Sequence, residues 1–485
     1  MVIEEPPPSA AGRPAFDARS LAAAVGGRLL RDSSREIRGG AVDSRRVQAG
    51  NAFFALPGDR TDGHEFLAQA VAAGAAALVV TRPPPAQLEA LTTAGDVAVL
   101  AVPDGLAALA AAARAWRTRF APVVVGITGS LAKTSTKEQV AEVLEERWTV
   151  LRNTANENNE IGLPLTLLRL APEHEVAVLE MGMYVPGDIR ALAELASPLV
   201  GVVTAVRGTH LSRAGSIEAI ERGKAELVEA LPTTGTAVLN ADDPLVARMA
   251  GRLPAGVRAL LYGFSPEAQV TAVDVQSRAE QGMRFVLRGC GRDVLVESPA
   301  LGRHGVHNAL AAAAVGKALG LDSATIGRGL ARPFSAPHRS VLHDLGAWRV
   351  LDDTYNAAPD SMVAALDLLA GLPGRRLAVL GEMLELGDGS REAHRQVGRH
   401  AAACADVLLC VGETAAAYGE GARAAGLEGA AVHEVGDQQA AYELLLETLR
   451  PGDVVLLKGS RGVALDLLVE RLLSAAGELR GGVGA

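Results

Sequence analysis

The sequence predicts an α/β protein with three domains: a small α/β domain at the N-terminus, a central domain built on a mostly parallel sheet, and a Rossmann-like domain at the C-terminus. The chain has 485 residues, which is enough for roughly three domains of ordinary size. Short apolar runs alternate with helical stretches, as in parallel sheets that helices cover on both faces. Pro333 and Pro337 bracket a segment that indicates an interdomain hinge.

Composition and charge argue against several classes of protein. The net charge is −9 and no basic stripe stands out, so a nucleic-acid partner is not expected. Alanine-rich runs such as residues 106–113 are too short to span a bilayer, so we expect a soluble protein without membrane insertion. The three cysteines, Cys290, Cys404 and Cys410, have neither metal-ligand nor disulfide spacing, which favours free core thiols in a reducing cytoplasm. We expect a monomer.

The first domain is expected over residues 16–121. Residues 1–15 before it are acidic and proline-rich, lack the order of a secretory signal, and are predicted to form a disordered tail. Within the domain the pattern predicts a helix near Leu21, a strand at 51–56, a helix at 65–73 and a strand at 76–81. The Arg-Pro-Pro-Pro stretch at 82–85 can continue neither a strand nor a helix, so it indicates a loop.

The central domain is expected over residues 122–333 and the last domain over residues 334–485. Buried strands are predicted in the central domain at 176–179, 200–206 and 237–239. Residues 267–299 break this rhythm, and strand-like runs at 270–275 and 283–287 predict an antiparallel hairpin on the edge of the sheet. In the last domain the predicted strands are 348–351, 377–380, 407–411 and 454–457.

A phosphate-binding loop is predicted at residues 126–137, Gly-Ile-Thr-Gly-Ser-Leu-Ala-Lys-Thr-Ser-Thr-Lys, between an apolar strand and a helix. Backbone N–H groups there can cradle phosphate oxygens, Lys133 can reach the β and γ oxygens, and Thr134 can hold Mg²⁺. A glycine is usual before the lysine, where this chain has Ala132. An ordinary strand-to-helix turn is the alternative. The candidate contacts are Gly129, Ser130, Ala132, Lys133, Thr134 and Ser135.

Two further segments of the central domain favour the same site. Glu180 ends an apolar strand, where ligands of open α/β sheets bind, and a buried carboxylate there would suit Mg²⁺; an exposed strand-end glutamate is the alternative. The asparagine-rich segment 153–159 is either a substrate loop, with Asn158 and Asn159 as contacts, or a plain turn. Lys224 lies in a helix that Ser216 is expected to cap, and on its own reads as a solvated lysine.

Several motifs together carry a resemblance to a known family. They are Asp-Ser-Arg-Arg-Val at 43–47, Asp-Gly-His-Glu-Phe at 62–66, Asp-Asp-Thr-Tyr-Asn at 352–356, Gly-Glu-Met-Leu-Glu-Leu-Gly at 381–387 and Lys-Gly-Ser-Arg at 458–461. With the phosphate loop, these segments resemble the Mur ligases, ATP-dependent amino-acid ligases of peptidoglycan precursor synthesis. The resemblance runs from about residue 41 to residue 462 and implies ATP and Mg²⁺ as cofactors.

The resemblance also implies roles for particular residues. Ser44 and Arg45 would contact the UDP end of the substrate, and Asn308 would contact adenine. The catalytic set would be Lys133, Lys224, His210 and Arg339, and the metal set Thr134, Glu180, His210 and Lys224, with Lys224 carbamylated on its amine. Asp353 and Arg339 would meet the nucleotide, and Asn158, Asn159, Tyr355 and Asn356 would contact the other substrates.

Within the family, the first domain and the 352–356 motif favour the reaction that joins D-alanyl-D-alanine to UDP-N-acetylmuramoyl-tripeptide through an acyl phosphate. Addition of another amino acid, folate polyglutamylation and a catalytically degenerate nucleotide-binding paralogue are the alternatives. The chain departs from the family pattern at Ala132, at Ser212 where a glutamate usually follows the histidine, and at His338 where a glycine usually precedes the arginine.

Overall fold

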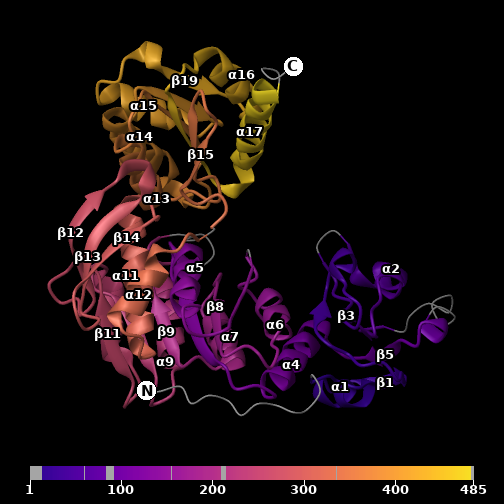
Figure 1. Cartoon of the computed structure of the whole chain (residues 1–485). Coiled ribbons are helices and arrows are strands. Elements are labelled where there is room, and N and C mark those ends of the chain that lie inside the picture. The colour runs from indigo at the N-terminus through magenta and orange to yellow at the C-terminus, as the bar shows by residue number, and fades with distance from the viewer. Residues whose placement is uncertain are drawn as a thin grey trace.

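The chain folds into three parts, each with its own sheet (Figure 1). The computed structural model describes residues 14–58, 61–82, 92–154, 156–208, 215–334 and 336–481, and their side chains as far as residue 475. The predicted tail, apart from residues 14 and 15, most of the predicted loop at 82–85, and His210 therefore lie outside the described residues.

The first part is a five-stranded sheet in the order β1-β5-β4-β3-β2. Neighbouring strands from β5 to β2 are parallel, and β1 pairs with β5 in the antiparallel sense. The strands are β1 (Arg28–Arg31), β2 (Gly40–Ala41), β3 (Ala52–Phe54), β4 (Ala77–Val80) and β5 (Ala98–Ala101). The helices are α1 (Ala18–Ala24), α2 (Leu67–Ala72) and α4 (Gly105–Arg117), with short 3-10 turns η1 (Ser44–Arg46) and η2 (Gly63–Phe66).

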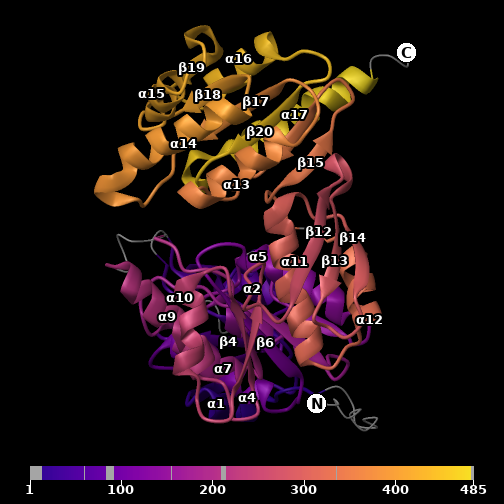
Figure 2. The ribbon, with the colours of Figure 1, turned by 90° about the vertical axis from the view of Figure 1, so that its left-hand side faces the viewer.

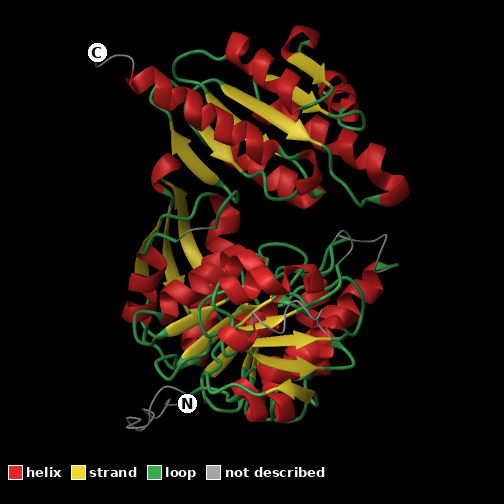
Figure 3. Ribbon diagram, turned by 90° about the vertical axis from the view of Figure 1, so that its right-hand side faces the viewer, coloured by secondary structure: helices red, strands yellow, loops and turns green. Residues whose placement is uncertain are grey.

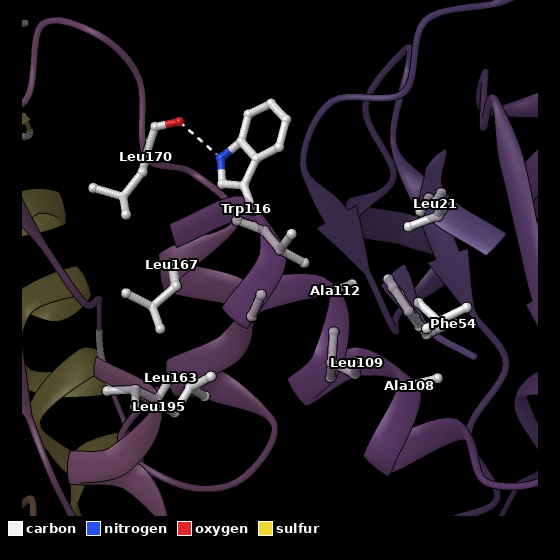
Figure 4. Close-up of a cluster of buried hydrophobic side chains, with 14 of the residues drawn as sticks. Leu21, Phe54, Ala108, Leu109, Ala112, Trp116, Leu163, Leu167, Leu170 and Leu195 are labelled. Atoms are coloured by element: carbon white, nitrogen blue, oxygen red, sulfur yellow. Dashed lines mark hydrogen bonds between the residues drawn. The ribbon is translucent and has the colours of Figure 1, made fainter. Parts of the chain in front are cut away.

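Helix α4 joins the first part to the second through one continuous apolar core. One face of α4 packs against Leu21 and Phe54, and other side chains of α4 lie toward Leu163 and Leu167 of the next part (Figure 4). The indole of Trp116 donates a hydrogen bond of 3.0 Å to the carbonyl of Leu170, so its only polar atom is satisfied within this core.

The central part holds a six-stranded, all-parallel sheet in the order β11-β10-β9-β6-β8-β7. Its strands are β6 (Val123–Thr128), β7 (Val150–Arg152), β8 (Val176–Glu180), β9 (Val200–Val203), β10 (Thr236–Asn240) and β11 (Arg258–Tyr262). The helices are α5 (Lys133–Leu144), α6 (Gly162–Leu167), α7 (Asp188–Ala196), α9 (Ile217–Glu229), α10 (Pro244–Ala247), α11 (Gly302–Ala318) and α12 (Ser323–Ala331). Ser216 caps α9 by accepting from the N–H of Ala219, as predicted.

The predicted antiparallel hairpin is present as part of a small three-stranded antiparallel sheet. It has three strands, β12 (Thr271–Ser277), β13 (Met283–Arg288) and β14 (Val294–Ser298), in the order β12-β13-β14. The prediction missed β14 because two of its five side chains are exposed, so it lacks a continuous apolar run. A single parallel bridge from Tyr262 to Val270 connects this sheet to the edge strand β11.

The last part is a six-stranded sheet in the order β15-β16-β20-β17-β18-β19, parallel except for β15. Its strands are β15 (Val341–Asp344), β16 (Arg349–Asp352), β17 (Arg376–Gly381), β18 (Val407–Val411), β19 (Val432–Val435) and β20 (Val454–Lys458). The helices are α13 (Pro359–Ala370), α14 (Ser390–Cys404), α15 (Ala416–Ala424), α16 (Gln438–Thr448) and α17 (Leu465–Gly481).

This last part stands over the central part, to which the chain connects near β15 (Figure 2). Helices flank the strands of the two six-stranded sheets (Figure 3). The predicted α/β class with three parts and mostly parallel sheets is confirmed. Among the described residues, no helix has both the length and the apolar character that crossing a bilayer requires.

Candidate active site

A cavity of about 850 Å³ lies between the central part and the last part. It brings together residues from the phosphate loop, the ends of central strands, helices α9 and α11, and the loops around β16 and β20. Most residues predicted for the site line this one space: Gly129, Ser130, Ala132, Lys133, Ser135, Asn158, Asn159, Glu180, Lys224, Asn308, Arg339, Asp353, Tyr355 and Asn356.

The phosphate loop is fixed against the segment that follows β9. The N–H of Ser130 donates to the carbonyl of Ala205 over 2.7 Å, and the hydroxyl of Ser130 donates to the carbonyl of Arg207 over 3.0 Å. The hydroxyl of Thr204 donates to the carbonyl of Leu131 over 2.6 Å. The loop therefore has a fixed backbone before any ligand binds.

Ala132 explains why a glycine is usual at its position. It precedes the first residue of α5 with φ 63° and ψ 5°, in the left-handed region that costs a residue with a Cβ atom roughly 1–2 kcal/mol. The turn into α5 needs this conformation whichever residue is present. The alanine therefore keeps the loop geometry and carries the strain that a glycine would avoid.

Lys133 begins α5 and folds back over the loop, where its ammonium donates to the carbonyl of Gly129 over 2.8 Å. Burial lowers the pKa of the Lys133 ammonium, the carboxylate of Glu180 opposes this shift, and the guanidinium of Arg339 adds to it. Two cationic groups from opposite sides of the cavity thus lie near enough to repel each other. An anion placed between them would relieve that repulsion.

Glu180 is a buried carboxylate at the carboxyl end of β8, only 2% exposed. One oxygen accepts from the hydroxyl of Thr134 over 2.7 Å, and the other accepts from the amide of Asn158 over 2.7 Å. Thr134 thus contacts Glu180 beside the cavity, and the two supply oxygen atoms of the kind that Mg²⁺ prefers. Asn153 hydrogen-bonds both backbone groups of Glu180, a contact that the sequence did not single out.

Lys224 is a buried lysine on α9, 5% exposed, and not the solvated residue that its isolated sequence context suggested. Within the described residues its ammonium has no hydrogen-bond or ion-pair partner. Burial lowers its pKa well below the ordinary value, and the nearby ammonium of Lys133 adds to the shift. A lowered pKa favours the neutral amine, which is the form that can react with an electrophile.

The last part contributes a cluster of polar side chains to the cavity. The guanidinium of Arg339 lies 3.9 Å from the ring centre of Tyr355, in cation–π geometry. Asp353 accepts from the buried ammonium of Lys458 over 2.6 Å, and that ammonium also donates to the carbonyl of Asn356 over 2.9 Å. Lys458 belongs to the quoted Lys-Gly-Ser-Arg motif, yet its buried pairing with Asp353 could be seen only in three dimensions.

Asn308 lies on α11 at the cavity wall, where its amide oxygen accepts from Thr136 at 3.4 Å. Its amide nitrogen keeps donors for a ligand. His304, one turn earlier on the same helix, also lines the cavity and was not predicted as a contact. Burial lowers the pKa of the His304 imidazole, with the carboxylate of Asp353 opposing the shift.

Three predicted contacts differ from the rest: two of these residues do not line the cavity, and the side-chain oxygen of the third already accepts a hydrogen bond within the chain. The hydroxyl of Ser44 donates to the side chain of Gln69 over 2.9 Å, and Arg45 pairs with Asp43 over 2.7 Å, both in the first part of the chain. Neither lines the cavity. Asn159 lines it, but its side-chain oxygen accepts from the N–H of Gly162 over 2.9 Å, at the start of α6.

Comparisons with known proteins match one family over each of the three parts of the chain. Three family models match: "Mur ligase family, catalytic domain" over residues 36–117, "Mur ligase middle domain" over 127–316 and "Mur ligase, glutamate ligase domain" over 338–461. The chain is 38% identical to the UDP-N-acetylmuramoyl-tripeptide–D-alanyl-D-alanine ligase of Synechocystis sp., over 89% of this chain and 91% of that protein.

Solved structures agree in fold. MurF from Acinetobacter baumannii matches with a TM-score of 0.85 and 30% identity over 95% of this chain and 99% of that one. MurF from Thermotoga maritima, solved in complex with ADP, matches with a TM-score of 0.77 and 28% identity over 91% and 98%. The three family models and the relative that matches over most of both chains show that this chain belongs to the Mur ligase family.

Proposed function

We propose that this chain is an ATP-dependent ligase that forms an amide bond between UDP-N-acetylmuramoyl-tripeptide and D-alanyl-D-alanine. The observation that carries the proposal is the shared cavity, in which Lys133 of the phosphate loop and Arg339 from beyond the hinge line one space. A relative that matches over most of both chains is named for this reaction.

The first step joins the tripeptide to phosphate. A carboxylate oxygen of the tripeptide attacks the γ-phosphorus of ATP, a new O–P bond forms, the bond to the bridging oxygen breaks, and ADP leaves. Lys133 and Arg339 offset the negative charge on the transferring group from two sides. In the second step the amine of D-alanyl-D-alanine attacks the acyl carbon, loses a proton, and displaces phosphate. Closure of the last part over the central part would keep water from the acyl phosphate.

The residues around Glu180 fit a Mg²⁺ ion. Glu180 offers a carboxylate and Thr134 a hydroxyl, both buried and on neighbouring elements. When bound at these residues, Mg²⁺ would offset the negative charge of the phosphate groups. His210 remains a predicted ligand. Lys224 would complete the set as a carbamate: its neutral amine attacks CO₂, an N–C bond forms, and a proton leaves, so that the neutral amine becomes an anion.

The other contacts follow the same proposal. Asn308 hydrogen-bonds the adenine base, and Asp353 contacts the nucleotide beside Lys458. Ser44 and Arg45 hold the UDP end from the first part of the chain, and the remaining polar residues at the cavity contact the peptide substrates: Asn158, Asn159, Tyr355 and Asn356. We also expect the reaction to take place in the cytoplasm, with the enzyme as a monomer.

An acceptor panel tests the proposal. Phosphate release is measured with ATP and Mg²⁺, with either UDP-N-acetylmuramoyl-tripeptide or a folate as the carboxylate substrate, while the amine is varied among D-alanyl-D-alanine, single amino acids and water alone. We expect release with D-alanyl-D-alanine only, and its loss in Lys133→Ala but not in Lys317→Ala, a lysine on α11 outside the cavity. Release only with another amino acid or only with a folate would refute the proposed substrates. No release with any acceptor would support a degenerate paralogue.

A further inference from the structure

Lys137 is a fully buried lysine for which the reaction above has no use. It lies on α5, one turn after Lys133, and its side chain is 0% exposed. Its ammonium donates to the backbone carbonyl of Asn153 over 2.5 Å and pairs with the carboxylate of Glu138 over 2.9 Å. Burying an ammonium costs several kcal/mol before pairing, so a lysine here needs a reason that an apolar side chain would not meet.

Asn153 connects this lysine to the candidate metal site. It follows the last residue of β7 and is itself 0% exposed. Its side-chain amide both donates and accepts hydrogen bonds. Its oxygen accepts from the N–H of Glu180 over 2.9 Å, and its nitrogen donates to the carbonyl of Glu180 over 3.0 Å. The nitrogen also donates to the carbonyl of Glu157 over 2.8 Å.

The side chain of Asn153 therefore continues the sheet where the backbone of β7 stops. The last backbone pair between β7 and β8 is Arg152 with Val178, two residues before Glu180. Only an asparagine or glutamine can imitate a peptide group by offering a donor and an acceptor together, and an aspartate would lose the donor. The N–H and C=O groups of Glu180, which face the β7 side of β8, are both held by this one amide, while the opposite side of β8 pairs with β6.

Lys137 in turn holds the peptide of Asn153 from the helix side. Glu138 not only balances the charge of Lys137 but also pairs with Arg152 over 3.0 Å, so the two consecutive residues Arg152 and Asn153 are both tied to α5. Because Lys133 and Thr134 begin that same helix, α5 positions both the phosphate loop and, through Asn153, the backbone of Glu180. The distance between them is set by a chain of short polar contacts rather than by packing alone.

We propose that Lys137 and Asn153 are positioning residues that set where the Glu180 carboxylate meets a Mg²⁺–nucleotide. The proposal rests on the proposed function, because it assumes that Glu180 contacts the metal. Groups that orient a metal ligand typically change metal affinity or activity by about 10- to 100-fold when they are removed. A lysine that served only stability would instead change the amount of folded enzyme and leave the metal dependence of each folded molecule intact.

The experiment measures phosphate release against Mg²⁺ concentration, at saturating substrates, for the full-length wild type, Lys137→Met, Asn153→Asp and the control Lys317→Met. We expect the half-saturating Mg²⁺ concentration to rise at least about tenfold in Lys137→Met and Asn153→Asp. The KM for D-alanyl-D-alanine should stay within about twofold, and Lys317→Met should match the wild type. Thermal melting of each variant gives its folded fraction.

Three outcomes decide the matter. An unchanged half-saturating Mg²⁺ concentration in folded Lys137→Met, with only a lower maximal rate, would overturn the proposal. If Lys137→Met does not fold, Asn153→Asp becomes the deciding variant: an unshifted Mg²⁺ dependence in folded Asn153→Asp would overturn the proposal equally. Failure of the proposed function is a different result, because the wild type itself would then release no phosphate with D-alanyl-D-alanine.

Discussion

Gly129, at the start of the phosphate loop, allows a direct test of how tightly that loop is held. Its φ is +152°, and a Cβ atom built on it would lie 1.8 Å from the hydroxyl oxygen of Thr204. Ordinary contact begins at 3.4 Å, so an alanine would be about 1.6 Å too close. Thr204 cannot simply turn away, because its hydroxyl donates to the carbonyl of Leu131 over 2.6 Å.

The expected effect of Gly129→Ala follows from that overlap. Either the loop or Thr204 must move by more than 1 Å, and a misplacement of about 1 Å can cost about 10²-fold in rate. We therefore expect kcat/KM for ATP to fall by about 10²-fold or more, which corresponds to about 2.7 kcal/mol in transition-state free energy. The assay is phosphate release with all three substrates over a range of ATP concentrations.

Gly426→Ala is the matched control for this substitution. Gly426 also has a positive φ, +97°, but an added Cβ there would have no atom within 4 Å. This variant carries backbone strain without a clash, and Gly426 is not among the residues that line the cavity, so its kcat/KM should equal that of the wild type. If Gly129→Ala kept kcat/KM for ATP within about threefold of wild type, the loop would be more adaptable than these contacts imply.

Three further perturbations follow from the site. Ala132→Gly should raise stability by about 0.5 kcal/mol in thermal melting, because the relief of left-handed strain slightly exceeds the entropy that glycine adds to the unfolded chain; a clear loss of stability would contradict the strain. Lys224 has a lowered pKa in the folded chain, so the unfolded chain binds more protons and the stability of the fold should rise with pH up to about 10.4. The urea midpoint should therefore rise less steeply with pH in Lys224→Met than in the wild type. Equal slopes of urea midpoint against pH in the two proteins would disprove the shift. Arg207 donates to both Asp243 and Asp360 over 2.5 Å. Arg207→Ala should lower the urea midpoint more than Asp360→Ala does, because only the first substitution leaves the buried carboxylate of Asp243 without its cationic partner. Equal losses would show that Asp243 is held well enough by backbone N–H groups.

Most of the buried strands could be predicted from the sequence, whereas several edge strands could not. Residues 407–411 form β18 as predicted, because a fully buried strand needs a continuous apolar run. The edge strands β1 and β15 have mixed or exposed side chains, and β2 is only two residues long. Such strands exist because a neighbour offers unpaired backbone groups, which is a property of the fold and not of the segment.

The candidate site divides in the same way. The loop residues and Glu180 could be located because each follows a strand directly, and parallel strands end at one edge of a sheet. Lys137 and Asn153 could not, because their contacts join residues 16 and 27 positions apart and a lysine within a helix reads as solvated. The burial of Lys224, likewise, depends on how α9 packs under the loop.

The joints between the parts differ in kind, and this has a consequence for salt. Helix α4 shares an apolar core with its neighbours, whereas Arg207 of the central part reaches Asp360 of the last part through side chains that are 41% and 55% exposed. Arg349 and Glu280 form a second ion pair across the same boundary. Added salt weakens ion pairs between exposed side chains, and sulfate strengthens apolar burial. Ammonium sulfate should therefore weaken the contact between the central and last parts and strengthen the contact between the first and central parts. The opening of the enzyme could then be changed without altering its catalytic residues.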